Sequence, residues 1–293
     1  MLKWLIIGGG VHGTYLSHLL TASMGVPRDQ LRVLDDHVRP LAVWRHLSAN
    51  CGMTHLRSPA THNLDLGIMS LHHHLRDRGG PGPGDFIPPY YRPSLPLFNT
   101  HCEAVIQANK LESLRLTGRA RSVRRASGGY LVETSRGPLR TERLLLALGT
   151  ADGLCHPAWV HGLRQKGARV DHLFDLAFER SRIGGEVRVA VIGGGISAAQ
   201  AALALANQVT LPVTLLSRHP LTESQFDFDP CWIGPKCLTD FYAQPYPLRR
   251  GTVDKARLPG TLPAEVLHQL KAAVDNKRIV LKIGEIETAR YGK

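Results

Sequence analysis

The sequence is poor in cysteine, and no two of its cysteines form a C-x-x-C pair. Its 293 residues include five cysteines, at positions 51, 102, 155, 231 and 237. An odd and dispersed set of this kind does not make a disulfide framework, and it favours a reducing compartment. Cys231 and Cys237 are spaced more widely than a redox-active C-x-x-C pair, so we expect them to be structural or incidental.

A long apolar run is also missing. The apolar stretch Leu2–Ile7 is far too short to cross a bilayer, which takes about 20 residues. It leads directly into a glycine turn, so we interpret it as a buried first strand rather than as part of a signal peptide. We therefore expect a cytoplasmic, soluble protein without a membrane partner.

Acidic residues are few relative to basic ones. The sequence has 24 Asp and Glu against 36 Lys and Arg, which gives a net charge of +12 and favours anionic partners. The basic residues are scattered, however, and the densest cluster, 119–125, alternates with small and apolar residues as an exposed strand edge does. We therefore expect no nucleic-acid partner. A hydrophobic content of 43% is enough for a proper core.

Two glycine-rich turns stand out, because each follows an apolar strand and each opens an apparent helix. The sequences are GGGVHG at 8–13 and GGGISA at 193–198, and both fit the pattern G-x-G-x-x-G/A. In that pattern the first glycine allows the tight turn, the second lets the backbone approach a pyrophosphate, and the third lets helix and strand pack closely. These roles fall to Gly8, Gly10 and Gly13 in the first turn, and to Gly193, Gly195 and Ala198 in the second.

The end of the strand after each turn differs in charge. The first unit has Asp35, with Asp36 as a substitute, and a carboxylate there suits the ribose hydroxyls of FAD or NAD. The second unit has Ser217 and Arg218, and a hydroxyl with an arginine fork suits a 2′-phosphate. We therefore predict FAD at the first turn and NADPH at the second.

The remaining pattern predicts an α/β protein with two Rossmann-like domains of the glutathione-reductase type. Three short strands at 119–148 form a β-meander, and 79–96 forms a long loop rich in glycine and proline. We predict an FAD domain at 1–165 that contains the meander, and an NADPH domain at 183–293. Helices are expected at 11–24, 101–110, 197–207 and 263–277, and 219–263 is expected to be loop-rich. Residues 40–75 mix apolar and polar groups and show no long period.

The order of these motifs resembles that of flavoproteins with two dinucleotide-binding domains. Within them it resembles the FAD- and NADPH-dependent monooxygenases, and most closely the lysine and ornithine N-hydroxylases. The resemblance implies a tryptophan near the flavin at Trp44, a strand passing close to FAD that ends at Gly149, and a histidine before the NADPH-binding strand at His172. It also implies that NADPH reduces FAD, and that one oxygen atom of O₂ then passes to a nucleophilic nitrogen or sulfur.

The chain departs from this family in two places. The F-x-G-x-x-x-H fingerprint of flavin-containing monooxygenases is not present around His172, where only the histidine fits. Relatives also return to the FAD domain with a further strand–glycine segment, and we expect that return to be absent here. Three hypotheses stay open: a monooxygenase that hydroxylates a lysine- or ornithine-like amine, a flavin-dependent NAD(P)H reductase or oxidase without oxygen insertion, and a non-catalytic FAD/NAD(P)-binding protein.

Other candidates lie outside the glycine turns. His55 and Arg57 follow Trp44 closely and are candidates for the flavin face, with a surface loop as the alternative. The tract 72–74 holds three histidines, but consecutive helical residues point in different directions and do not ligate one ion, so we expect no metal. The aromatic segment 226–232 forms either a substrate wall or core. We expect a small-molecule substrate and leave self-association into a homo-oligomer open.

Overall fold

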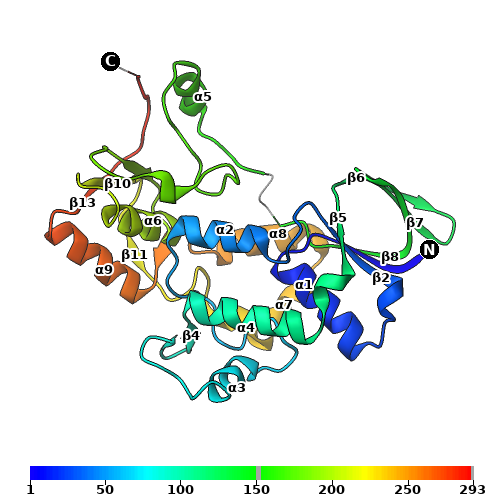
Figure 1. Ribbon diagram of the computed structural model, residues 1–293. Helices are drawn as coiled ribbons and strands as arrows, with labels where there is room; N and C mark the ends of the chain where they lie inside the picture. The colour runs from blue at the N-terminus through cyan, green and yellow to red at the C-terminus, as the bar shows by residue number, and fades with distance from the viewer. Residues whose placement is uncertain (150–152, 292–293) are drawn as a thin grey trace. The chain divides into compact units, whose positions relative to one another are not determined.

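The computed structural model describes residues 1–149 and 153–291, which fold into two compact units (Figure 1). The first unit consists of Met1–Ala49, Thr54–Leu154 and Phe174–Leu176. The second consists of Asn50–Met53, Cys155–Leu173 and Ala177–Lys293. Residues 155–165, which we assigned to the FAD domain, are grouped with the second unit.

The first unit is built on a six-stranded sheet. From one edge to the other its strands are β5 (Arg115–Thr117), β2 (Leu31–Asp35), β1 (Leu2–Ile7), β8 (Gly137–Leu146), β7 (Gly129–Thr134) and β6 (Ala120–Ala126). The first four strands are parallel to one another, and the last two are antiparallel to their neighbours. The predicted meander is confirmed as β6–β7–β8, and its final strand returns to pair with β1.

The second half of the central strand β1 is buried, and both its neighbours are parallel strands. Leu5 and Ile6 have no exposed surface, and Leu34 on β2 is 1% exposed. This pattern is typical of parallel sheets, whose strands are apolar on both faces. The first helix follows β1 at once as α1 (Val11–His18), continues as the π-helical turn η1 (Leu19–Ser23), and packs against β1 and β2.

Three further helices of the first unit are α2 (Ala42–Cys51), α3 (Ser70–Arg76) and α4 (Leu95–Ala108). Helix α2 lies in the 40–75 segment, where the mixed polar and apolar sequence showed no long period. Helix α4 begins six residues earlier than predicted, because Ser94 caps it by accepting a hydrogen bond from the N–H of Leu97. The smaller elements are η2 (Arg28–Gln30), β3 (Phe86–Ile87), β4 (Arg92–Pro93) and η3 (Leu111–Leu114).

The apolar end of β8 is exposed. The strand ends at Leu146, which is 62% exposed, and Leu148 is 65% exposed. Both lie beyond the point where the strand is covered, at the carboxyl edge of the sheet. Gly149 follows with φ +65°, and Thr150 lies outside the described residues.

The second unit contains a three-stranded parallel sheet with the order β13 (Ile279–Ile283), β10 (Val213–Ser217) and β9 (Ala190–Ile192). The helices α6 (Ile196–Ala206) and α9 (Ala264–Asp275) pack against each other and against the sheet. Their buried faces share one apolar core, to which Ala202, Val213, Leu215 and Leu270 contribute. These elements confirm the predicted βαβ start, although β9 is shorter than the apolar run at 187–192.

The rest of the second unit is more helical than we predicted. The elements are α5 (Ala158–Gln165), η4 (Arg180–Arg182), β11 (Thr222–Glu223), η5 (Pro230–Ile233), α7 (Pro235–Ala243), α8 (Tyr246–Ala256) and β12 (Thr261–Leu262). Proline opens both α7 and α8, where it suits the first turn of a helix, and we had interpreted these prolines as signs of a loop. A disulfide joins Cys231 to Cys237 across the start of α7.

No helix within 1–149 and 153–291 combines the length and apolarity needed to cross a membrane.

Candidate functional site

The first glycine turn has the geometry that a bound dinucleotide requires. Gly8 has φ +105°, and a Cβ there would lie 2.2 Å from the carbonyl oxygen of Ala147. A Cβ on Gly13 would lie 1.8 Å from the carbonyl oxygen of Gly8, so the helix reaches the strand only without a side chain. Around Gly10, by contrast, a Cβ would meet nothing within 4 Å. The turn is therefore tight on its inner side and open at the position where a phosphate approaches.

Asp35 is anchored beside this turn at the end of β2. Its Oδ2 accepts a hydrogen bond from the N–H of Gly9 at 2.5 Å, and its Oδ1 accepts one from the N–H of His37 at 2.8 Å. Burial alone would raise the pKa of Asp35, but these N–H groups and the Arg115 guanidinium hold it below its usual value. The carboxyl group is therefore a fixed anion next to the glycine turn, as we predicted from the strand end.

Arg115 is a residue of this site that the sequence did not reveal to us. It begins the edge strand β5, and its side chain is 6% exposed. The guanidinium donates to the carbonyl oxygens of His37 and Val38, and its Nη2 lies 3.1 Å from Oδ1 of Asp35. Its Nη1 fills the space beside Gly9, where a Cβ would lie 2.1 Å away. No local motif marks this arginine, because its role depends on the pairing of β5 with β2.

Trp44 lies on α2 and is held by α4. Its Nε1 donates to Oδ1 of Asn99 at 3.1 Å, and its ring meets the ring of Phe98 edge-on at a centroid distance of 5.5 Å. Leu146 and Leu148 leave apolar surface exposed at the carboxyl edge of the sheet, which is where ligands bind in open α/β sheets. The residues of the first unit thus fit a dinucleotide with an apolar ring system.

The second glycine turn is more enclosed. Gly193 has φ +149°, and its Cβ would lie 3.0 Å from Cβ of Ala198. Around Gly195 the nearest atom is Cα of Gly260, at 3.9 Å from a built Cβ. The imidazole of His219 occupies the space beside both Gly194 and Gly260, where Cβ atoms would lie 3.0 Å and 2.2 Å from its Cε1. The 219 and 260 loops therefore form a second wall at this turn.

Ser217 and Arg218 have different surroundings at the end of β10. Ser217 is fully buried, and its hydroxyl donates to the carbonyl oxygen of His219 at 2.6 Å. This contact gives the serine a role in shaping the loop that we had not foreseen. Arg218 is exposed, and no described residue binds its guanidinium, so it is available to an anion.

The two flavin-face candidates lie in the first unit, on the segment after α2. The Nε2 of His55 lies 2.8 Å from the carbonyl oxygen of Gly84, so the ring ties this segment to the long 79–94 loop. Arg57 is half-buried. In the second unit, the ring of His172 meets that of His156 edge-on at 5.4 Å. A flavin contact for His55 and Arg57 stays a prediction.

The histidine tract on α3 points in several directions, as we predicted. His72 stacks on Phe86 at a centroid distance of 4.9 Å, His73 is exposed, and His74 meets His101 edge-on. Within the described ranges, no group of three or more His, Cys, Asp or Glu side chains is placed to hold a metal ion.

A partly buried polar chain joins α1, α3 and α4, and the sequence did not predict it. His18 contacts Asp65 at 2.9 Å, Ser70 donates to Asp65 at 2.6 Å, and Nε2 of His101 lies 2.9 Å from Oγ of Ser70. Burial, together with the neighbouring His74, lowers the pKa of His101 to about 4. Asp65 contacts Ser70 directly and does not orient His101, the histidine that faces the serine, so the arrangement is not a nucleophilic triad.

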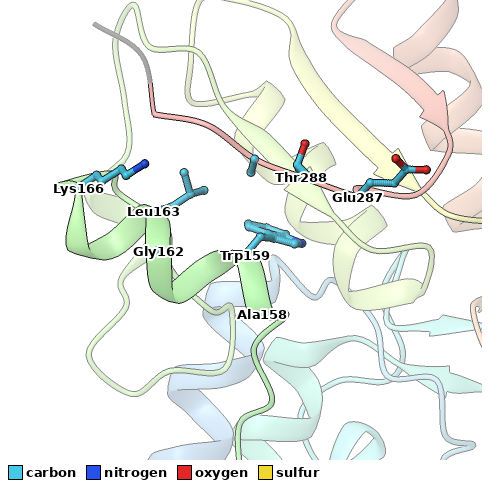
Figure 2. A pocket seen from close by; sticks show the side chains of 8 residues that line it. Ala158, Trp159, Gly162, Leu163, Lys166, Glu287 and Thr288 are labelled. Atoms are coloured by element: carbon cyan, nitrogen blue, oxygen red, sulfur yellow. The ribbon is translucent and has the colours of Figure 1, made fainter.

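A separate cavity of about 360 Å³ lies in the second unit, between α5 and the segment 287–289 (Figure 2). The indole of Trp159 and the side chain of Leu163 form part of its wall, with Lys166 at one end and Glu287 at the other. Neither glycine turn contributes a residue to this cavity.

Comparison with known proteins identifies the fold. No protein-family model matches the sequence, and no curated protein matches it either. Among solved structures, the chain is similar to a cadaverine monooxygenase of the desferrioxamine biosynthetic pathway from Erwinia amylovora, solved with FAD bound. The TM-score is 0.71 and the identity 16%, over 99% of this chain and 71% of that one. The fold is that of the FAD- and NAD(P)-binding flavoproteins.

Two other neighbours have the same fold. L-lysine 6-monooxygenase from Pseudomonas syringae gives a TM-score of 0.62 at 16% identity, over 98% of this chain and 73% of that one. A bacillithiol disulfide reductase from Staphylococcus aureus gives 0.57 at 17% identity, over 97% of this chain and 66% of that one. The chain therefore spans about two-thirds to three-quarters of the length of these proteins.

Proposed function

We propose that this protein is an FAD-dependent oxidoreductase that uses NADPH and hydroxylates a nitrogen nucleophile, such as a lysine- or ornithine-like amine. The observation that carries the proposal is the pair of glycine turns with opposite charges at the following strand ends. Asp35 is a fixed carboxylate beside the first turn, and Arg218 is an exposed guanidinium beside the second. One chain then holds a ribose-selective site and a phosphate-selective site.

In this proposal, one set of residues binds FAD and another binds NADPH. The open backbone at Gly10 and the start of α1 hold the FAD pyrophosphate through N–H groups and the positive end of the helix. Gly195 and the start of α6 do the same for NADPH, and Arg218 binds its 2′-phosphate. Trp44 and the apolar carboxyl edge of β8 exclude water from the flavin ring. The bound flavin supplies the electron transfer and the oxygen chemistry.

Two of the structural neighbours are amine monooxygenases, and this supports nitrogen hydroxylation over the other flavin chemistries. The disulfide reductase among the neighbours keeps the second hypothesis open. In that hypothesis the protein passes electrons from NADPH to an acceptor without inserting oxygen.

The test is an absorbance spectrum of the purified protein, before and after anaerobic NADPH. Flavin bands near ~370 and ~450 nm that bleach with NADPH and far less with NADH support the two sites. Oxygen consumption is then measured with lysine, ornithine and cadaverine. Oxygen consumption that rises with an amine and yields the hydroxylated amine supports the monooxygenase. Flavin bleaching by NADPH with oxygen consumption that does not depend on an amine supports a reductase or oxidase. A protein that binds no FAD after reconstitution contradicts both enzymatic functions.

A further inference from the structure

Arg115 is a buried cation at the first site to which the proposed function assigns no contact with a ligand. Its strand, β5, pairs in parallel with β2, so that Arg115 lies opposite Val33 and its side chain reaches the end of β2. The guanidinium contacts the 35–38 segment at three points, and its Nη1 lies against Gly9. The cation therefore lies beside both the Asp35 carboxylate and the glycine turn.

The hydrogen-bond count at Asp35 limits what this carboxylate can do alone. A carboxylate has about four acceptor positions, two on each oxygen. Oδ1 accepts from the N–H of His37, and Nη2 of Arg115 and Nδ1 of His37 lie 3.1 Å and 3.2 Å from it. Among the described residues, Oδ2 accepts from the N–H of Gly9 alone. One acceptor position, on Oδ2, is left for a ligand.

A ribose presents two neighbouring hydroxyl groups, and a carboxylate that accepts from both of them needs two vacant acceptor positions. Here the second hydroxyl finds a donor instead of an acceptor. Nη1 of Arg115 has no hydrogen bond to any residue in the described part of the chain, and it lies on the Gly9 side of the guanidinium. A hydroxyl group accepts as well as it donates, so it can bind either partner.

We infer, on the basis of the proposed FAD site, that Asp35 and Arg115 recognise the adenosine ribose together. One hydroxyl donates to Oδ2 of Asp35, and the other accepts from Nη1 of Arg115. Arg115 is in this view a specificity residue as well as a support for Asp35. Gly9 is required because a side chain there would displace Nη1, since its Cβ would lie 2.1 Å away.

The test compares FAD with two analogues that lack either the 2′- or the 3′-hydroxyl of the adenosine ribose. The flavin-free full-length protein is titrated with each, and flavin fluorescence reports the first site regardless of the second. We expect the wild type to prefer FAD over each analogue by about tenfold or more, as for hydrogen bonds to charged groups. We expect Arg115→Met to lose the preference for one hydroxyl group and to keep the preference for the other. We expect Asp35→Asn to weaken the preference that Arg115→Met keeps.

Two more variants separate recognition from support. Gly9→Ala leaves Arg115 in the chain but displaces its Nη1, and we expect it to lose the same hydroxyl preference as Arg115→Met. Arg119→Met also removes a positive charge, but from an exposed arginine that pairs with Asp36. We expect its affinities for FAD and for both analogues to stay within twofold of the wild type. Thermal unfolding of each variant reports its folded state.

The outcomes are distinct. If Arg115→Met weakens FAD and both analogues by the same factor, Arg115 is only a support and the inference is overturned. If the wild type binds no flavin, this inference and the proposed function are both overturned. If the hydroxyl preferences follow the expected pattern but NADPH does not bleach the flavin, ribose recognition by Arg115 holds and the proposed oxidoreductase function fails.

Discussion

Nε2 of His18 lies 2.9 Å from Oδ1 of Asp65, and this contact ties the helix of the first glycine turn to a loop 47 residues further along the chain. Ser70 and His101 continue the chain of contacts to α3 and α4. Polar groups that are buried in this way stabilise a fold only while each keeps its partner and its charge state.

The first prediction is that the protein loses stability in mild acid because of His101. Its folded pKa of about 4 lies below the unfolded value of 6.5, so the unfolded chain binds a proton first as the pH falls. The contribution of His101 to the free energy of unfolding is present in full above pH 6.5 and declines as the pH falls to 4. At pH 5 the loss from this group alone is about 2 kcal/mol. The lowered pKa of Asp65 adds a further loss below pH 3.8.

Urea unfolding at pH 7.5 and pH 5 measures this loss. His101→Gln keeps a polar side chain that cannot titrate, so the difference between the two pH values is expected to shrink by about 2 kcal/mol. An unchanged difference in the variant would show that another group causes the acid sensitivity.

The second prediction separates two glycines of the same turn. Gly13→Ala places a Cβ 1.8 Å from a backbone oxygen, so we expect it to destabilise the fold by about 2 kcal/mol or more. Gly10→Ala meets open space, and φ −71° suits alanine, so the fold is expected to keep its thermal midpoint. Its methyl group blocks the phosphate instead and weakens FAD binding by about 10–100-fold. Thermal unfolding and flavin titration of both variants check this contrast.

The third prediction concerns the nicotinamide nucleotide. Arg218→Gln removes the exposed cation without disturbing any described contact, and we expect it to weaken NADPH binding by about 10–100-fold while NADH binding stays the same. Ser217→Ala is the neighbouring control. It deletes the buried hydroxyl that binds His219, so it is expected to lower stability by about 1 kcal/mol. Equal losses for NADPH and NADH in Arg218→Gln would place the 2′-phosphate elsewhere.

The fourth prediction concerns the five cysteines. Cys231 and Cys237 are joined, Cys51 and Cys102 are buried, and burial raises the pKa of the Cys102 thiol to about 12. Cys155 is exposed. Alkylation of the native protein without reductant is therefore expected to add a single label, at Cys155, when followed by intact-mass spectrometry. Addition of dithiothreitol is expected to bring the count to three. Three labels before reduction would contradict the disulfide.

Local patterns predicted those parts of the fold that local chemistry decides. The two glycine turns were recognisable because only glycine tolerates φ +105° at Gly8 or the close approach at Gly13. Asp35 followed from its place at the end of β2, and the meander from its alternating apolar residues. The carboxylate and both turns lie where the sequence placed them.

Long-range contacts explain what the sequence could not predict. Arg115 reaches Asp35 only because β5 pairs with β2, and a strand of three residues carries too weak a pattern to be recognised. Helix α2 was missed because its mixed sequence lacks a clear helical period. Ser217 looked like a phosphate ligand from its neighbours in the chain, while its hydroxyl is turned inward to His219.

The division of the chain into units has a consequence for dissecting the protein. The polypeptide passes from one unit to the other five times, after residues 49, 53, 154, 173 and 176. The short stretch Asn50–Met53 belongs to the second unit, where Asn50 donates to the carbonyl oxygen of Phe178 and accepts from the N–H of Arg180. A gene cut at residue 154 would leave this stretch on the wrong fragment. A fragment that begins at residue 155 would therefore lack a stretch whose Asn50 binds Phe178 and Arg180.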